Sequence, residues 1–400
     1  MQQSYTDDQL YDLMTQLCVQ DVAIVNQNQA LSLNVSDWTR LWDIAIQHKI
    51  GPLLSQRLLA LNLNIPDALK HRANQHRNTN LQIAFSHCAE LVKLNKLFAS
   101  HNVNYLVFKG VGLSRLLGSD LSLRHVGDVD ILLVDKQQFE LVDELLYSIG
   151  YSRSVLGEKK RLASYQVEHI VAKEKDVVYY SEKSKIVIEL HLRLTVAFTS
   201  FPVPTAELYE RRSYFKVGTT SIPVMSIHDH GLYLIIHSSL VIEVHRLKWY
   251  FDILNVQNST LYNYDSLEFE PRVNKLRVRR SVVEGLMVAN AELAMPVPKW
   301  VGEYYMTSWI TRQFVARARQ KLRNQISPED GVIRNMLHRF YFIFIYAPFS
   351  TEGWAHKVEH MKGYLLRKSD WNVIELPENY HFLYYFTRPF IWIVRLIKGR

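Results

Sequence analysis

YLVFKGVGLSRLLGSDLSLRHVGDVDILLV, residues 105–134, decides the fold that we expect for this chain. It contains an apolar run that ends at Lys109-Gly110, a short amphipathic segment, and a second apolar run that opens with Asp128 and Asp130. Because alternate side chains of a strand point to the same face, the two aspartates would project together from the start of a strand. Two carboxylates held close together repel each other unless a cation or a proton joins them, so the pair indicates chemistry.

The bulk composition is that of a globular protein that we expect in the cytoplasm. The chain has 400 residues, 48% of them hydrophobic, and can bury more than one core. Its formal net charge of +8 suggests affinity for phosphates, nucleic acid or anionic lipid. Two distant cysteines, Cys18 and Cys88, argue against a disulfide framework and a structural zinc site. The sequence has neither the pattern of a signal peptide nor an apolar stretch of about 18 to 20 residues that could span a membrane.

The residues on either side of the opening stretch divide into helical and β-rich segments. Apolar residues recur at spacings of three and four through most of residues 7–99, which predicts helices. Another helix is predicted over residues 136–150, where Gly150 ends the pattern. Short β-rich runs then predict hairpins or a meander, at residues 169–172, 177–180 and 185–194.

Helical periodicity returns after the β-rich runs. Ser226 with Asp229 three residues later is the pattern of a capping box. From there the helical pattern continues without a break to residue 254, which predicts one long helix. Further helices are predicted over residues 273–294 and 301–324.

Three segments of the C-terminal half could contact a larger partner. The helix predicted over 301–324 has a basic face that could bind nucleic acid, although we expect a solvated face. The aromatic and basic segments 340–349 and 382–397 could make peripheral contact with a membrane surface. We expect these two segments to pack against the protein instead.

Three carboxylates form the candidate metal site. Glu189 lies on the polar face of the strand predicted over 185–194, so it is the best-placed third carboxylate. Carboxylates suit Mg²⁺, which takes few protein ligands and keeps water and phosphate oxygens for the rest. We therefore predict that Asp128, Asp130 and Glu189 are catalytic and bind Mg²⁺ or Mn²⁺. Glu189 would also orient or deprotonate an attacking hydroxyl. Such a site suits nucleotidyl transfer, because a divalent ion can bridge phosphates and offset charge as pyrophosphate leaves.

A glycine-containing turn and nearby cations are candidates for binding phosphate. Lys109, Gly110 and Gly112 belong to the sequence KGVG, at the point where a strand is predicted to turn into a helix. Backbone N–H groups at such a point can bind phosphate oxygens, and glycine permits a close approach. Arg124 precedes the aspartate pair and Arg193 follows the third carboxylate. These five residues are predicted to bind the nucleotide.

These motifs resemble the uncharacterised nucleotidyltransferase family of bacterial proteins, within the polymerase-β-like nucleotidyltransferase superfamily. The resemblance rests on five motifs: FKGVGL at 108–113, LRHVGDVDILLV at 123–134, the helix ending SIGY at 148–151, IELHLRL at 188–194 and HRLKWYFDIL at 245–254. It extends to AIQHKIGPLL at 45–54 and to LRKSDWNVIELPENYHFLYYFTRP at 366–389, so it spans most of the chain. It implies an α+β fold, with a mixed sheet in a catalytic core flanked by helical regions. We expect a helical N-terminal region over 1–101, a nucleotidyltransferase core over 102–225 and a helical C-terminal region over 226–400.

The resemblance also implies roles for single residues. It implies the same three carboxylates as metal ligands and Gly110 in the turn that holds the phosphates. It brings the HRLKW motif near the active site, where Arg246 or Lys248 could contact phosphate or the acceptor. The superfamily usually has a serine after the glycine of this turn, and this chain has Val111 instead. Lys109 would then compensate for the missing hydroxyl.

The activity implied is metal-dependent transfer of a nucleoside monophosphate from a nucleoside triphosphate to an acceptor, with release of pyrophosphate. A sugar or another small molecule is the favoured acceptor, with RNA and protein as alternatives, and surface-polysaccharide or other biosynthesis is the expected setting. One rival is a non-catalytic descendant that binds a nucleotide or a partner. Another is a phosphohydrolase of the His-Asp kind, built from His228, Asp229 and His230 with His191 and Asp252.

Overall fold

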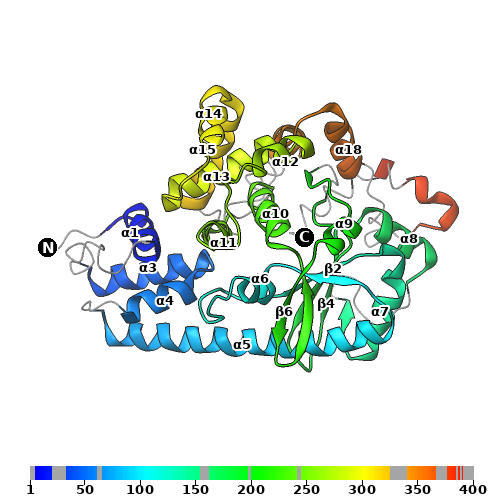
Figure 1. The fold of residues 1–400 in the computed structure, drawn as a ribbon, viewed down its shortest axis with the longest axis horizontal. Coiled ribbons are helices and arrows are strands. Elements are labelled where there is room, and N and C mark those ends of the chain that lie inside the picture. The colour runs from blue at the N-terminus through cyan, green and yellow to red at the C-terminus, as the bar shows by residue number, and fades with distance from the viewer. Residues whose placement is uncertain are drawn as a thin grey trace.

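A mixed sheet lies at the centre of the structure, a computed structural model, and helices cover both of its faces (Figure 1). This arrangement confirms the expected α+β fold. The structure describes residues 5–19, 33–60, 65–153, 162–196, 200–240, 245–324, 340–365, 376–383, 386–387 and 390.

The described sheet has seven strands in the order β3-β4-β5-β2-β1-β7-β6. Its central strands β1 and β2 are buried along their whole length, as their continuous apolar runs require. β2 runs antiparallel to β1 and parallel to β5. β4 and β5 form an antiparallel hairpin from two of the three predicted β-rich runs, and β3, which was not predicted, pairs antiparallel with β4. The strands are β1 Tyr105–Val107, β2 Val129–Leu133, β3 Ser152–Arg153, β4 Asp176–Tyr180, β5 Val187–His191, β6 Ser213–Val217 and β7 Thr220–Val224.

The N-terminal part of the chain is helical, as predicted. The 34-residue helix α5, Asp67–Ser100, runs across one face of the sheet (Figure 1). Its side chains Leu91 and Phe98 join a buried cluster with strand residues such as Ile131. The helices before it are α1 Asp7–Val19, α3 Val35–Gln47 and α4 Gly51–Ala60.

Short helices connect the strands. One of them corrects the sequence prediction, because residues 169–172 lie in a helix, α8, and not in a strand. Periodicity cannot separate a helix from a strand over four apolar residues. The connecting helices are α6 Gly110–Leu116, η1 Lys136–Gln138, α7 Phe139–Ser148, α8 Ser164–Lys173 and α9 Thr205–Glu210.

The C-terminal part is also helical, but its helices are shorter than predicted. Ser226 caps α10 by accepting a hydrogen bond from the N–H of Asp229, as the capping-box pattern predicts. Where one long helix was predicted to run to residue 254, the structure has two, the first ending at Ser239 and the second beginning at Leu247. The predicted helices 273–294 and 301–324 are also each divided in two. The helices are α10 Ile227–Ser239, α11 Leu247–Gln257, α12 Phe269–Leu276, α13 Arg279–Leu293, α14 Lys299–Thr307, α15 Trp309–Arg323, η3 Phe342–Tyr346, α17 Ala347–Ser350, α18 Trp354–Leu365 and η5 Glu378–Leu383.

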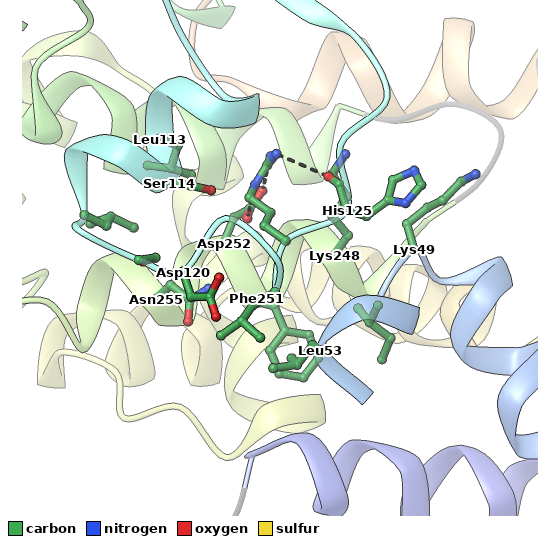
Figure 2. Close-up of a pocket in the computed structure, with 15 residues that line it drawn as sticks. Lys49, Leu53, Leu113, Ser114, Asp120, His125, Lys248, Phe251, Asp252 and Asn255 are labelled. Atoms are coloured by element: carbon green, nitrogen blue, oxygen red, sulfur yellow. Dashed lines mark hydrogen bonds and ion pairs between the residues drawn. The ribbon is translucent and has the colours of Figure 1, made fainter. Parts of the chain in front are cut away.

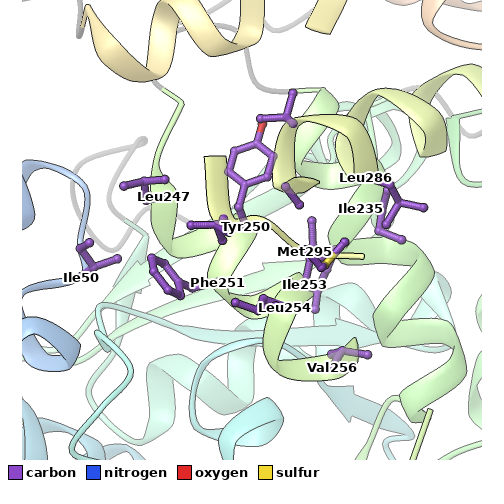
Figure 3. Close-up of a cluster of buried hydrophobic side chains, with 14 of the residues drawn as sticks. Ile50, Ile235, Leu247, Tyr250, Phe251, Ile253, Leu254, Val256, Leu286 and Met295 are labelled. Carbon is purple, nitrogen blue, oxygen red and sulfur yellow. The ribbon is translucent and has the colours of Figure 1, made fainter. Parts of the chain in front are cut away.

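Two large hydrophobic clusters hold these layers together. The first cluster joins α1, α3 and α4 to α10, α11 and α13 and includes Leu106 and Leu132 on one face of the sheet. The second lies between α5, α7 and the other face of the sheet, which carries Val107 and Ile131. Figure 3 shows the first cluster, with Ile50 beside Phe251 of α11 and Ile235 of α10 beside Leu286 of α13. Both clusters contain residues from more than one of the three predicted regions, whose boundaries follow residues 101 and 225. The division into three regions therefore stays a prediction.

The contacts of the basic and aromatic segments bear on the predicted partner surfaces. On α15, Arg319 and Arg323 pair with Glu292 of α13, so part of its basic face is used inside the protein. Most of segment 382–397 lies outside the described residues. Among the described residues, no helix is long and apolar enough to cross a membrane. Cys18 and Cys88 are free and buried, in agreement with the absence of a disulfide framework.

Candidate functional site

The strands β2 and β5 bring two of the predicted carboxylates side by side. Asp130 and Glu189 are partners in the parallel register of these strands. His191 Nε2 lies 3.1 Å from Asp130 Oδ1 and 3.3 Å from Glu189 Oε2. One potential ligand atom from each of the three side chains lies within 4.8 Å of the others. The spacing of Glu189 and His191, two residues apart on one strand, puts both on the face that Asp130 occupies.

Asp128 adds a third carboxylate at the start of β2. It is half-buried and comes directly before the first residue of the strand. Burial raises the pKa of the Asp128 carboxyl, and the neighbouring charges of Asp130 and Glu189 raise it further. The three predicted carboxylates therefore lie close enough to repel one another, which is the situation that a bound cation relieves.

Lys109 is the cation that lies closest to the buried carboxylate. Its Nζ is 3.6 Å from Asp130 Oδ1 and lies over the rings of Phe108 and Tyr233. Burial alone would lower the pKa of Lys109, but Asp130 and Tyr233 raise it above its ordinary value. Burial alone would raise the pKa of Asp130, but Lys109 and His191 hold it well below its usual range. Asp130 is thus charged although it is only 3% exposed.

The turn between β1 and α6 is held by a histidine from another helix. Lys109 has φ 54° and ψ −154°, a conformation that residues with side chains rarely adopt. Its N–H donates to His230 Nε2 of α10 at 2.8 Å, so His230 Nδ1 carries the proton and donates to the Met225 carbonyl at 3.1 Å. Burial lowers the pKa of His230 to about 4, which keeps the ring neutral near pH 7. Sequence reasoning missed this role.

Gly110 and Gly112, both predicted to bind the nucleotide, are required by the fold for different reasons. Gly110 has φ +45°, which a residue with a side chain would adopt only with strain. At Gly112 a Cβ would lie 2.7 Å from Val107 Cγ1, so a glycine lets α6 pack directly on β1. Val111 is buried in the hydrophobic cluster below the sheet. Val111 is therefore part of the hydrophobic core, at the position where the superfamily pattern has serine.

Arg124 and Lys248 lie beside the carboxylates. The Nε and Nη2 atoms of Arg124 each donate to Asp252 at 2.8 Å, so this arginine is paired. The negative charges of Asp128 and Asp130 also act to raise the pKa of Arg124 and that of Lys248. Burial and the charge of Arg124 lower the pKa of Lys248 to about 8. Asp252 comes from α11, 128 residues after Arg124, and its role was not predicted.

The other two predicted cations have contacts elsewhere. Arg193 donates to the Val171 carbonyl of α8 at 2.8 Å. Arg246 is the N-cap residue of α11, and its charge acts on His48 and Lys49. Within the described residues, no hydrogen bond or ion pair joins either arginine to the three carboxylates. Their roles in nucleotide binding stay predictions.

The residues of the His-Asp alternative point to separate partners. His228 is exposed and packs against the ring of Tyr262. Asp229 is fully buried and accepts hydrogen bonds from Arg211, Arg272 and Ser226. The third residue of this motif holds the turn before α6, as described above. The described geometry therefore does not bring this motif together as a metal site.

The chain was compared with family models and with known proteins. A family model described as "Uncharacterised nucleotidyltransferase" matches residues 34–294, more than half of the chain. A solved structure of a lincosamide antibiotic adenylyltransferase with lincomycin bound has 20% identity and a TM-score of 0.29, and covers 42% of this chain and 96% of its own. An antigenic nucleotidyltransferase-like protein from Paracoccidioides brasiliensis has 15% identity and a TM-score of 0.31, and covers 53% of this chain and 94% of its own. No curated protein matches the chain.

Proposed function

The chain belongs to the uncharacterised nucleotidyltransferase family, and we propose that it moves a nucleoside monophosphate from a nucleoside triphosphate to an acceptor hydroxyl, with release of pyrophosphate. Family membership supports nucleotidyl transfer in general. The metal dependence, the acceptor and the site residues are our proposal. The observation that carries it is the register of β2 and β5, in which Asp130 is the partner of Glu189 and Asp128 lies two residues away.

The proposed metal ligands are Asp128, Asp130 and Glu189. Their hard oxygen atoms fit Mg²⁺ or Mn²⁺ better than softer metals. The raised pKa of Asp128 supports this fit, because the mutual repulsion of the carboxylates makes a cation favourable there. When bound, the ion would offset negative charge on the phosphates of the substrate.

The side chains of the site suggest how the reaction proceeds. Glu189 would orient the acceptor hydroxyl or accept its proton. The acceptor oxygen then forms a bond to the α-phosphorus, and the bond from this phosphorus to the bridging oxygen of pyrophosphate breaks. The electron pair of that bond leaves with pyrophosphate. His191 would keep Asp130 and Glu189 in position by donating from Nε2.

The phosphates are proposed to lie near the turn that follows β1. Lys109, Gly110 and Gly112 would contact the triphosphate, with Lys109 supplying the charge that a hydroxyl at Val111 cannot supply. Lys248, on whose pKa Asp128 and Asp130 also act, would supply a second positive charge. A sugar or another small molecule is the favoured acceptor.

A labelling experiment tests this function. The protein is incubated with each nucleoside triphosphate, labelled at the α-phosphorus, together with Mg²⁺ and a cell extract. We expect the label to move to one acceptor species while pyrophosphate appears. The variant Asp130→Asn should lose at least about 100-fold of this activity, because a charge-stabilising interaction worth several kcal/mol is removed.

The matched control is Asp67→Asn, which removes one carboxylate from the exposed start of α5. It should transfer label at the rate of the unchanged protein. If nucleotide with Mg²⁺ raises the melting temperature but no label moves in any extract, the protein is a binding descendant of the family. Full activity in Asp130→Asn would contradict the proposed site.

A further inference from the structure

A pocket of about 110 Å³ is lined by Lys248, a residue whose pKa is affected by the charges of Asp128 and Asp130 (Figure 2). It is formed by the start of α4, by α6, by the segment before β2 and by α11. From α6 the pocket is lined by Leu113 and Ser114, whereas Lys109, Gly110 and Gly112, which are proposed to hold the triphosphate, do not line it. The pocket therefore adjoins the turn proposed to hold the triphosphate, and it has Arg124, Lys248 and Asp252 in its wall.

Positive charge gathers at one end of this pocket. Lys49, His125 and Lys248 lie on the same side of it in Figure 2. Burial and the charges of Lys248 and Lys49 lower the pKa of His125 to about 3, which agrees with two cations close to its ring. Within the described residues, neither lysine side chain forms an ion pair or a hydrogen bond. Arg124 is already neutralised by Asp252.

The two lysines are held in position by the fold. Lys49 follows α3 with φ 59°, and Lys248 is in the first turn of α11. His48, between α3 and Lys49, is 1% exposed and joins these segments. Its carbonyl accepts from the N–H of Lys248 at 3.3 Å, and its Nδ1 accepts from the N–H of Leu247 at 3.3 Å. These hydrogen bonds bring the backbone of Lys49 and that of Lys248, about 200 residues apart in sequence, to one end of the pocket.

The rest of the lining limits what can enter. Ser114 and Asn255 offer hydrogen-bonding groups, and Leu53 and Phe251 give an apolar surface. Asp120 lies at the end away from the lysines and pairs with Arg77 at 3.7 Å. A cavity of about 150 Å³ holds a single benzene ring, so this pocket has room for one small group of a ligand.

We propose that this pocket is an anion-binding subsite for a phosphate group carried by the acceptor, held between Lys49 and Lys248. Both lysines line the pocket and both lower the pKa of His125, and a bound phosphate would offset this positive charge while accepting hydrogen bonds from the ammonium groups. The charges of Asp128 and Asp130 act to raise the pKa of Lys248, so Lys248 lies near these carboxylates. A phosphate bound by Lys248 would therefore bring the acceptor next to them. This inference rests on the proposed function and names the class of acceptor as a phosphorylated small molecule.

Calorimetric titration without nucleotide or metal tests the subsite. The probes are inorganic phosphate, glucose 6-phosphate and glucose, at low ionic strength because salt screens exposed charges. We expect the two phosphates to bind and glucose not to bind. Lys49→Met should weaken phosphate binding about tenfold or more, since a hydrogen bond from a charged group is lost.

Two further variants make the result specific. Lys49→Arg keeps the charge and should retain most of the binding, whereas Lys70→Met removes an exposed lysine of α5 outside the pocket and should bind as the unchanged protein does. Melting temperatures check that each variant is folded. Phosphate binding by Lys49→Met at the affinity of the unchanged protein would overturn the subsite.

A competition experiment identifies the molecule that carries the phosphate. Phosphate binding that persists in the presence of Mg²⁺ and a non-hydrolysable nucleoside triphosphate supports an acceptor subsite. Displacement by that nucleotide assigns the pocket to the nucleotide and overturns the acceptor assignment. Because the titrations need no turnover, the subsite can fail while nucleotidyl transfer is observed, and transfer can fail while phosphate binds.

Discussion

His230 Nε2 accepts a 2.8 Å hydrogen bond from the backbone N–H of Lys109, a residue 121 positions earlier in the chain. The same ring donates from Nδ1 to the Met225 carbonyl and is fully buried. Lys109 has an unusual backbone conformation and also places its Nζ beside Asp130. A single histidine of α10 therefore holds the turn from which the proposed site is built.

Replacing this histidine should weaken both stability and transfer. His230→Ala leaves the N–H of Lys109 and the Met225 carbonyl without their partner, which costs about 1–3 kcal/mol for a buried unsatisfied group. The turn would then relax and move Lys109 away from Asp130. Urea unfolding measures the stability loss and the labelling assay measures the activity. His230→Gln, which can still accept near the position of Nε2, should recover part of both, and an equal loss in the two variants would contradict this role.

The same histidine predicts a dependence of stability on pH. The folded-state pKa of His230 is lowered to about 4, so between about pH 6.5 and pH 4 the unfolded chain binds a proton that the folded protein does not. Stability should therefore fall as the pH is lowered through this window. Urea unfolding at pH 7.5, 6.0 and 5.0 measures the slope.

The comparison with a variant isolates the contribution of His230. His48 and His125 are also buried with lowered pKa values, so they contribute to the slope of every variant. His230→Gln should show a smaller loss of stability between pH 7.5 and 5.0 than the unchanged protein. Identical slopes would show that His230 is not kept neutral by the fold.

Asp128 should be more important for activity than for stability. Burial, Asp130 and Glu189 raise its pKa, so its negative charge at pH 7 destabilises the folded protein. Asp128→Asn removes that charge and keeps the shape, and we expect an equal or higher melting temperature together with a loss of at least about 100-fold in transfer. Thermal unfolding and the labelling assay check the two parts, with Asp67→Asn as the exposed control. Full activity would remove Asp128 from the site.

Local pattern predicted the part of the site that depends on neighbours in sequence. Asp128 and Asp130 lie at the start of an apolar strand, and Glu189 follows from alternation in β5, although the catalytic roles of all three stay predictions. Contacts between distant segments could not be predicted, because no local signal links Arg124 to Asp252 or His230 to Lys109.

The same limit explains the errors in secondary structure. The short run His169-Ile170-Val171-Ala172 fits a helix or a strand equally well, and the structure places it in α8, which contacts α7. The uninterrupted pattern after Ser226 cannot reveal the break before α11, which makes Arg246 the N-cap residue of that helix.

His191 separates two ways in which the site could bind its metal. Its Nε2 faces oxygen atoms of both Asp130 and Glu189, at 3.1 and 3.3 Å, so we infer that Nε2 carries a proton and positions the carboxylates. His191→Gln keeps a donor, and Mg²⁺ or Mn²⁺ should still raise the melting temperature, at a concentration about 10- to 100-fold higher, as when a residue that orients metal ligands is changed. Asp130→Asn should lose the response. Titration of each metal into the two variants, followed by thermal unfolding and reversed with a chelator, makes the measurement. If His191→Gln abolishes the response as Asp130→Asn does, His191 is itself a ligand, and the preference should then move from Mg²⁺ towards metals that favour imidazole.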